Sequence, residues 1–237
     1  MVFGRKKRSK KDYKGLVTLA SPGSLISEQF RTLKTNIEFS MVDKKLKSLV
    51  ITSSMPDAGK STVAANLAIT FARQGYRVLL AESDFRRPSV HKAFQVLNGA
   101  GMTSLLSNPE LTVEECVLET DINNLSLMTC GPIPPNPAEL IGSNRMKDLQ
   151  DKLVSKYDLV IFDTPPLLGF GDAQIMAGRA EGTIFVVRHG VAKKENILKA
   201  NEILKRVNAN VLGVVYNQVP TSEQDNSYYY YYYTEEN

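Results

Sequence analysis

The chain holds few of the residues from which metal centres and disulfide frameworks are made. Among its 237 residues are only two histidines and two cysteines. The histidines, His91 and His189, are too few to favour a zinc site. The cysteines, Cys116 and Cys130, are not in a C-x-x-C spacing, which fits a protein of the reducing cytoplasm.

Long apolar runs are also absent. No stretch reaches about 18 consecutive apolar residues, so we expect no transmembrane helix. The N-terminus is charged and no apolar stretch follows it, which excludes a signal peptide. A hydrophobic content of 43% is enough for a core, and 237 residues fit one large α/β domain or two small ones.

The positive charge of the chain lies in its first residues. Residues 1–14 hold seven Lys or Arg against Asp12, a net charge of +6, and the chain total of +4 leaves about −2 for the rest. The body is therefore not a nucleic-acid-binding surface. The basic arm either contacts anionic lipid, where each cation adds about 1 kcal/mol, or is a solvated tail, and the residues leave both interpretations open.

Six tyrosines stand in a row near the C-terminus. Neither the alternation of a strand nor the periodicity of a helix explains six consecutive aromatic residues. Residues 221–237 are otherwise polar, so we predict a disordered tail with accessible hydroxyl groups. Those hydroxyls are either phosphate acceptors or part of a sticky low-complexity tail. The acceptor interpretation is favoured because the body of the chain carries a phosphate-binding motif. The tyrosines are Tyr228, Tyr229, Tyr230, Tyr231, Tyr232 and Tyr233.

Short apolar runs alternate with helical patterns along the body. Residues 15–26 are predicted to be a linker, and a helix is predicted to begin at Ser27. Strands buried on both faces and alternating with helices predict an α/β fold with a doubly wound, mostly parallel sheet flanked by helices. The predicted strands are 49–52, 78–81, 125–128, 159–162, 184–187 and 211–215, and the predicted helices include 63–74, 146–156 and 194–207.

The first predicted strand runs into a P-loop. Residues 54–62, SMPDAGKST, lie between a strand and a helix, which is the context that this motif requires. Backbone N–H groups would wrap the phosphates, Lys60 would reach the β- and γ-phosphates, and the Ser61 hydroxyl would bind Mg²⁺. Ser54 stands where the strict pattern has glycine, but a small residue still makes the turn. The nucleotide-binding residues are Pro56, Asp57, Ala58, Gly59, Lys60, Ser61 and Thr62.

Carboxylates end two other predicted strands. Asp163 closes an apolar run, as the Walker B aspartate does when it holds Mg²⁺; the alternative is a turn or cap aspartate. Glu82 and Asp84 point the same way if the strand stays extended, so one contacts the metal region while the other accepts a proton from tyrosine. Arg86 neutralises phosphoryl charge or locks these carboxylates. The alternative for this cluster is a surface group of ion pairs.

A stiff loop precedes one further helix. In residues 131–140, GPIPPNPAEL, Asn136 is expected to be the N-cap and Pro137 the first helical residue.

Together these motifs resemble the bacterial tyrosine kinases (BY-kinases) that regulate capsule and exopolysaccharide synthesis, in their stand-alone cytoplasmic form. The resemblance runs from about Ser24 to the tyrosine tail. It implies the P-loop sheet of the cell-division-positioning ATPases. It also implies ATP and Mg²⁺ bound by Lys60, Ser61, Thr62, Asp84 and Asp163.

The resemblance implies further roles. Glu82 would be the base for tyrosine, Asn217 would contact the adenine, and a neighbouring subunit would phosphorylate the tail in trans. The interface motif of the family falls on Glu28, Arg31 and Lys34 and would close a ring, commonly an octamer. The implied domains are a flexible basic arm and linker over 1–26, a P-loop tyrosine kinase domain over 27–220 and the tail over 221–237.

The resemblance also implies partners. A transmembrane chain-length regulator would activate the kinase through its cytoplasmic tail and recruit it from the cytoplasm to the inner face of the membrane. A cognate tyrosine phosphatase would reverse its action, and nucleic acid would not be bound.

Three positions depart from the family pattern, and two rival functions remain. Glu82 stands where the family usually has aspartate, and Asp57 stands where glycine is frequent. Lys34 replaces an arginine of the interface motif, and lysine cannot make a forked pair.

The first rival function is that of a P-loop switch ATPase, which usually has a lysine where Met55 stands. The second is a nucleotide-responsive scaffold without catalysis. Loss of tail phosphotyrosine on changing Lys60 to Met would separate a kinase from both.

Overall fold

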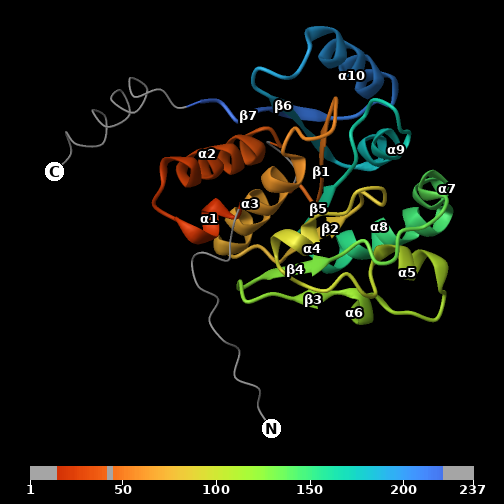
Figure 1. Cartoon of the computed structure of the whole chain (residues 1–237). Coiled ribbons are helices and arrows are strands. Elements are labelled where there is room, and N and C mark those ends of the chain that lie inside the picture. Colours follow the sequence, from red (N-terminus) through yellow and green to blue (C-terminus); the bar gives the residue numbers. More distant parts are fainter. Residues whose placement is uncertain (1–14, 42–44, 221–237) are drawn as a thin grey trace.

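The computed structural model describes residues 15–41 and 45–220, and a seven-stranded sheet runs through the centre of this part of the chain. The expected α/β architecture is confirmed, with helices on both sides of the sheet (Figure 1). The strands are β1 (Ser48–Ser53), β2 (Val78–Glu82), β3 (Leu118–Glu119), β4 (Leu125–Met128), β5 (Leu159–Asp163), β6 (Gly182–Arg188) and β7 (Val211–Asn217).

The strand order brings distant motifs together. The sheet runs β3-β4-β2-β5-β1-β6-β7, and every pair is parallel except β3 with β4. Strand β5 lies between β1 and β2, and Asp163 pairs in register with Ile51 on one side and Glu82 on the other. The loops that follow these three strands therefore meet at one edge of the sheet, where ligands bind in open parallel sheets.

Two layers of helices bury the two faces of the sheet. Helices α1, α2 and α3 lie on one face, and α8, α9 and α10 lie on the other (Figure 1). The helices are α1 (Val17–Ala20), α2 (Leu25–Phe39), α3 (Lys60–Arg73), α4 (Val90–Ala93), α5 (Met102–Ser107), α6 (Val113–Cys116), α7 (Pro137–Gly142), α8 (Asn144–Lys156), α9 (Asp172–Arg179) and α10 (Lys194–Arg206).

The central strands are apolar throughout because both faces are covered. In β1, Leu49 and Ile51 pack in the cluster of helix α3, whereas Val50 packs in the cluster of helices α8 and α9. All three side chains are fully buried. This two-sided burial explains why the predicted strands read as continuous hydrophobic runs rather than as alternating ones.

The predicted linker over 15–26 differs from the structure. Leu16 is 1% exposed and helix α1 packs against α3. The side chain of Asn66 in α3 accepts hydrogen bonds from the backbone N–H and the hydroxyl of Thr18, both at 2.9 Å, and donates to the carbonyl of Gly15 at 2.6 Å. The segment is therefore a docked part of the body. Residues 1–14 of the expected arm lie outside the described residues.

Helix starts agree with expectation in one place and shift in another. Helix α2 begins at Leu25, because Ser24 rather than Ser27 is the N-cap and its hydroxyl accepts from the N–H of Ser27. Pro137 is the first residue of α7, as expected, after Asn136. Across the described ranges, no helix has the length and apolar character needed to cross a membrane.

Candidate active site

The phosphate loop joins β1 to α3 and has the backbone shape that a P-loop needs. Gly59 precedes the helix with φ of +89°, a left-handed conformation that favours glycine. A Cβ atom at this position would lie 2.1 Å from Nδ2 of Asn217, so only glycine fits. The N-terminus of α3 therefore opens toward the loop, where free N–H groups and the helix dipole favour an anion.

Lys60 and Ser61 are the first two residues of α3. Lys60 is only 7% exposed, so its ammonium group is held inside the site rather than in bulk water. The Ser61 hydroxyl accepts a hydrogen bond of 2.9 Å from the hydroxyl of Ser89, a residue that follows β2. Both side chains expected to face phosphate and metal thus lie at the carboxyl edge of the sheet.

Asp163 is a buried carboxylate of the site whose pKa is raised. Its side chain ends β5, and the residue is 1% exposed. Neither carboxylate oxygen has a partner in good hydrogen-bond geometry within 15–41 and 45–220, although Ser61 lies near. Burial, partly offset by the Lys60 charge and the Ser61 hydroxyl, raises the pKa of Asp163 to about 7.

Such an unpartnered buried carboxylate fits a bound cation. No group of three or more His, Cys, Asp or Glu side chains capable of holding a metal exists in the part of the chain that the structure describes. A set of one hydroxyl and two carboxylates suits Mg²⁺ that keeps waters and phosphate oxygens as its other ligands. Ser61, Asp84 and Asp163 are the residues that would supply such a set, since Ser61 is in the first turn of α3 and the two aspartates lie at or just after the carboxyl ends of β5 and β2.

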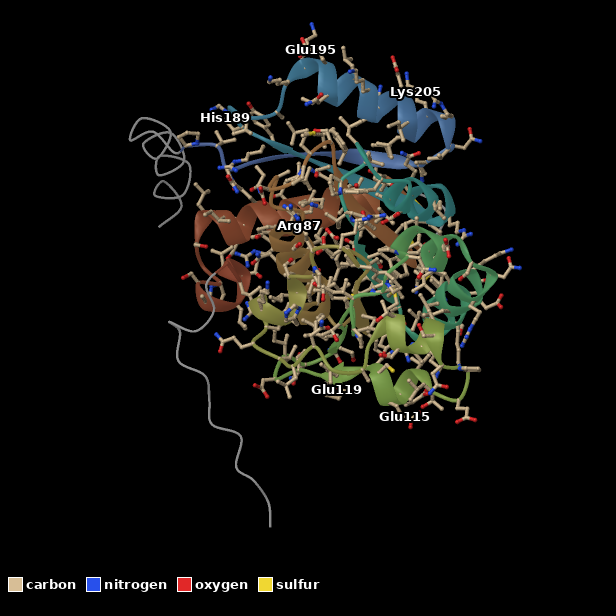
Figure 2. All side chains as sticks on the ribbon, turned by 45° about the vertical axis from the view of Figure 1, so that its right-hand side comes forward. Arg87, Glu115, Glu119, His189, Glu195 and Lys205 are labelled. Atoms are coloured by element: carbon tan, nitrogen blue, oxygen red, sulfur yellow. The ribbon has the colours of Figure 1, made fainter. Side chains whose placement is uncertain are left out.

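Asp84 shapes the turn that follows β2. Its Oδ1 atom accepts the backbone N–H groups of Arg86 at 3.2 Å and Arg87 at 3.0 Å, and the residue is 9% exposed. The turn is thereby fixed around the carboxylate. The Arg87 side chain is exposed, and in the view of Figure 2 its label stands below that of Glu195 on α10 and above that of Glu119 on β3.

Glu82, the expected base for tyrosine, is occupied by hydrogen bonds from the backbone. It is fully buried, and Oε1 accepts the N–H groups of Val90, at 2.6 Å, and of Ser89. Its Oε2 atom accepts the N–H of Cys130 at 3.2 Å. The carboxylate therefore holds three backbone segments together and does not point toward an incoming hydroxyl in this conformation.

The neighbouring thiol is not a nucleophile. Burial, together with the negative charges of Glu82 and Asp84, raises the pKa of Cys130 to about 12. Cys116 is also buried, and its pKa is raised by burial. The chemistry of the site therefore rests on oxygen groups and lysine.

Arg86 reaches away from the loop toward helix α9. Its Nε donates to Oδ2 of Asp172 at 2.8 Å, and its guanidinium carbon lies 4.0 Å from the ring centroid of Phe170. The Arg86 side chain therefore pairs with the first residue of α9, and only its backbone N–H contacts Asp84. Sequence reasoning missed Asp172, because no motif spacing marks it.

Asn217 connects the end of β7 to the phosphate loop. Its Nδ2 donates to the carbonyl of Ala58 at 2.9 Å, and Arg188 donates to the carbonyl of Asp57 at 3.3 Å. The backbone N–H of His189 donates to the carbonyl of Asn217 at 2.9 Å. The residue expected to contact adenine therefore lies beside the loop and supports it.

The three expected interface residues lie on α2 but differ in exposure. Arg31 pairs with Glu28 and donates to the carbonyl of Pro22 at 3.1 Å, and the hydrogen bond from Arg31 lowers the pKa of Glu28. Lys34 is 7% exposed and lies 2.7 Å from Oε2 of Glu38. Glu28 and Arg31 thus face outward, whereas Lys34 belongs to the packing of its own chain. The six tail tyrosines lie outside the described residues.

The fold and the site define a P-loop NTPase of the doubly wound type. A family model described as "ParA: NUBPL iron-transfer P-loop NTPase" matches residues 45–237. The chain is 46% identical over 213 residues to the tyrosine-protein kinase YwqD of Bacillus subtilis, covering 90% of each chain. It is 37% identical over 207 residues to the putative tyrosine-protein kinase CapB of Staphylococcus aureus, covering 87% of this chain and 90% of that one.

The same family appears among solved structures. The chimerical protein CapA2B2 matches with a TM-score of 0.84 and 40% identity, over 88% of this chain and 92% of that one. The chain belongs to the bacterial tyrosine kinase (BY-kinase) family.

Proposed function

We propose that this chain is an ATP-dependent protein-tyrosine kinase that phosphorylates its own C-terminal tyrosines and regulates capsular or extracellular polysaccharide synthesis and export. The observation that carries the nucleotide chemistry is the buried, unpartnered carboxylate of Asp163 near Lys60. Membership of a family whose relatives are named as tyrosine-protein kinases supports tyrosine as the acceptor.

In the proposed reaction the loop residues bind and orient ATP. Backbone N–H groups of 56–62 hold the phosphates, and Lys60 neutralises charge that develops on the transferred group. Ser61, Asp84 and Asp163 would hold Mg²⁺, which when bound would neutralise charge on the phosphates. Arg86, held by Asp172, keeps the turn of Asp84 in place.

The proposed proton acceptor is Glu82. Catalytic hydrogen bonds often form only in the substrate complex, so the buried geometry does not rule out this role. To accept the tyrosine proton, the carboxylate must leave the N–H groups of Ser89 and Val90 and turn toward the edge of the sheet. If Glu82 must break these hydrogen bonds to act as the base, kinase activity would depend on how strongly the segment of Ser89 and Val90 is bound to it.

The proposed acceptors are Tyr228 to Tyr233 of a neighbouring subunit. The partly exposed side chains of Glu28 and Arg31 are proposed to form the contacts of a homo-oligomeric ring such as an octamer. The activating partner is proposed to be the cytoplasmic tail of a transmembrane chain-length regulator, which recruits the cytoplasmic kinase to the inner face of the membrane. A cognate tyrosine phosphatase removes the phosphate.

The test is detection of phosphotyrosine after the purified chain is incubated with Mg-ATP, with and without the activator peptide. Signal on the tail that is lost in Lys60→Met, and lost when Tyr228 to Tyr233 become phenylalanine, is the expected result. ATP binding should persist in the phenylalanine variant. Bound ATP without phosphotyrosine in either condition would instead favour the scaffold or switch ATPase.

A further inference from the structure

Two arginine–aspartate pairs lie at opposite edges of the sheet: Arg77 and Asp158 immediately precede β2 and β5, whereas Arg86 lies in the turn after β2 and Asp172 is the first residue of α9. Before the strands begin, Arg77 donates to Asp158 at 2.9 Å, and both side chains are largely exposed, at 63% and 42%. After the strands end, Arg86 donates to Asp172 at 2.8 Å, and the Asp172 side chain is only 1% exposed. The first pair lies at the amino edge of the sheet and the second lies at the edge that carries the site.

Both pairs are forked, since Arg77 also makes two side-chain hydrogen bonds to Asp158, at 2.9 and 3.1 Å, and the second pair differs from the first in burial and in ring stacking. Arg86 makes two contacts to Asp172, from Nε to Oδ2 at 2.8 Å and from Nη2 to Oδ1 at 3.4 Å. Its guanidinium plane also lies over the ring of Phe170, with the central carbon 4.0 Å from the ring centroid. Forked pairing and stacking are both specific to arginine, and the buried carboxylate depends on this partner for its charge.

This pair fixes the direction of a site carboxylate. The backbone N–H of the same Arg86 donates to Oδ1 of Asp84, so a fixed Arg86 side chain also fixes the turn around Asp84. On the other side, residues 164–171 connect Asp163, at the end of β5, to Asp172, at the start of α9. The Arg86–Asp172 pair therefore joins the two segments that carry the carboxylates of the site.

We propose that Asp172 is a positioning residue, which together with Phe170 holds Arg86 so that Asp84 keeps the orientation needed for a magnesium ion on the nucleotide. This inference rests on the proposed function only in assigning Asp84 to the metal. Removing a group that orients a metal ligand typically weakens metal affinity by about 10- to 100-fold.

The experiment compares Asp172→Asn with Asp158→Asn in the full chain. Each variant removes the acidic partner of a forked arginine pair, and the Asp158 pair lies at the edge of the sheet away from the site, so Asp158→Asn is the matched control. The first measurement is ADP affinity with and without Mg²⁺, which needs no kinase activity. The second is the Mg²⁺ concentration for half-maximal tail phosphorylation.

For Asp172→Asn we expect unchanged ADP affinity without Mg²⁺, loss of most of the tightening by Mg²⁺, and a requirement for about 10-fold more Mg²⁺. Asp158→Asn should match the parent chain in both measurements. Parent-like Mg²⁺ dependence in folded Asp172→Asn would overturn the proposal. A parent chain that shows Mg²⁺-dependent ADP binding but no phosphotyrosine would count against the kinase assignment and leave this comparison decisive.

A second variant covers the case in which Asp172→Asn does not fold. Phe170 is 37% exposed, so Phe170→Ala removes the stacking on Arg86 without leaving a buried charge unpaired. The expected change is a smaller rise in the Mg²⁺ requirement in the same direction. Unchanged Mg²⁺ dependence in Phe170→Ala would then contradict the proposal.

Discussion

The carboxylate of Glu82 accepts the backbone N–H of Val90 at 2.6 Å, eight residues further along the chain. This bond, together with those from Ser89 and Cys130, ties the turn after β2 to the start of α4 and to the loop after β4. An aspartate is one methylene shorter, so glutamate at this position changes what the carboxylate can reach.

Glu82→Gln tests whether this residue also serves as a base. A glutamine keeps an acceptor oxygen for Val90 but cannot take up the tyrosine proton. We expect the rate of tail phosphorylation to fall by about 100-fold or more, while ADP still binds. Single-turnover phosphotyrosine formation measures the rate. A rate within about twofold of the parent would mean that Glu82 only holds the backbone.

The raised pKa of Asp163 predicts how the stability of the metal-free chain depends on pH. Its pKa is about 7 in the folded chain against 3.8 as the ordinary value, so the folded state binds the extra proton between these values. The contribution of Asp163 to the free energy of unfolding is therefore greatest below about pH 4 and is lost as the pH rises through about 7.

Asp163→Asn should remove this pH dependence, because asparagine does not titrate. We expect the variant to unfold at a higher temperature than the parent at pH 8 in EDTA, and to lose phosphoryl transfer. Thermal unfolding at several pH values measures the first effect. Equal unfolding temperatures for both chains at pH 8 would contradict the buried, unpartnered state of the carboxylate.

Asn217→Ala should loosen the phosphate loop by removing the donor to the Ala58 carbonyl. One hydrogen bond contributes about 0.5–1.5 kcal/mol, so ATP affinity should fall by about 3- to 10-fold. Asn210 is a matched control, because it lies just before the other end of β7 and its Nδ2 likewise donates to a backbone carbonyl, that of Glu181, at 2.7 Å. Asn210→Ala should leave ATP affinity unchanged in equilibrium titrations, and equal losses in both variants would refute the assignment.

Lys34 and Arg31 should respond in opposite ways to substitution. The Lys34 ammonium group lies 2.7 Å from Glu38 and 5.7 Å from the ring centroid of Tyr76, so Lys34→Ala should lower the unfolding temperature of the monomer. Arg31→Ala breaks an exposed pair with Glu28 of about 0–1 kcal/mol, so it should leave that temperature nearly unchanged and reduce ring assembly. Light scattering measures assembly, and rings that persist in Arg31→Ala would exclude this surface.

The sheet was predictable because its central strands are buried on both faces. Runs such as 49–52 and 159–162 are apolar at every position up to their ends, and the P-loop between β1 and α3 follows a known spacing. Strand β3 was missed because it has only two residues and little burial. Helix α1 was missed because the contacts that hold it come from Asn66, about fifty residues away.

In the candidate site too, residues marked by their neighbours in the sequence were predictable, and those defined by contacts with distant residues were not. Asp84 and Asp163 were found because each follows an apolar strand that the sequence reveals. The direction of Glu82 was not predictable, because its donors include Cys130, which approaches only when β4 joins β2. Asp172 was missed for the same reason, since its partner Arg86 is 86 residues away.

The position of β5 between β1 and β2 has a consequence for synthesis on the ribosome. The strands that precede the P-loop and the acidic turn are not neighbours in the sheet, and the strand that separates them is completed only at Asp163. A nascent chain shorter than this has the P-loop and the turn of Asp84 but no strand to align them. The emerging polypeptide therefore gains its phosphoryl-transfer centre only after about two thirds of translation, before the tyrosines at its end are made.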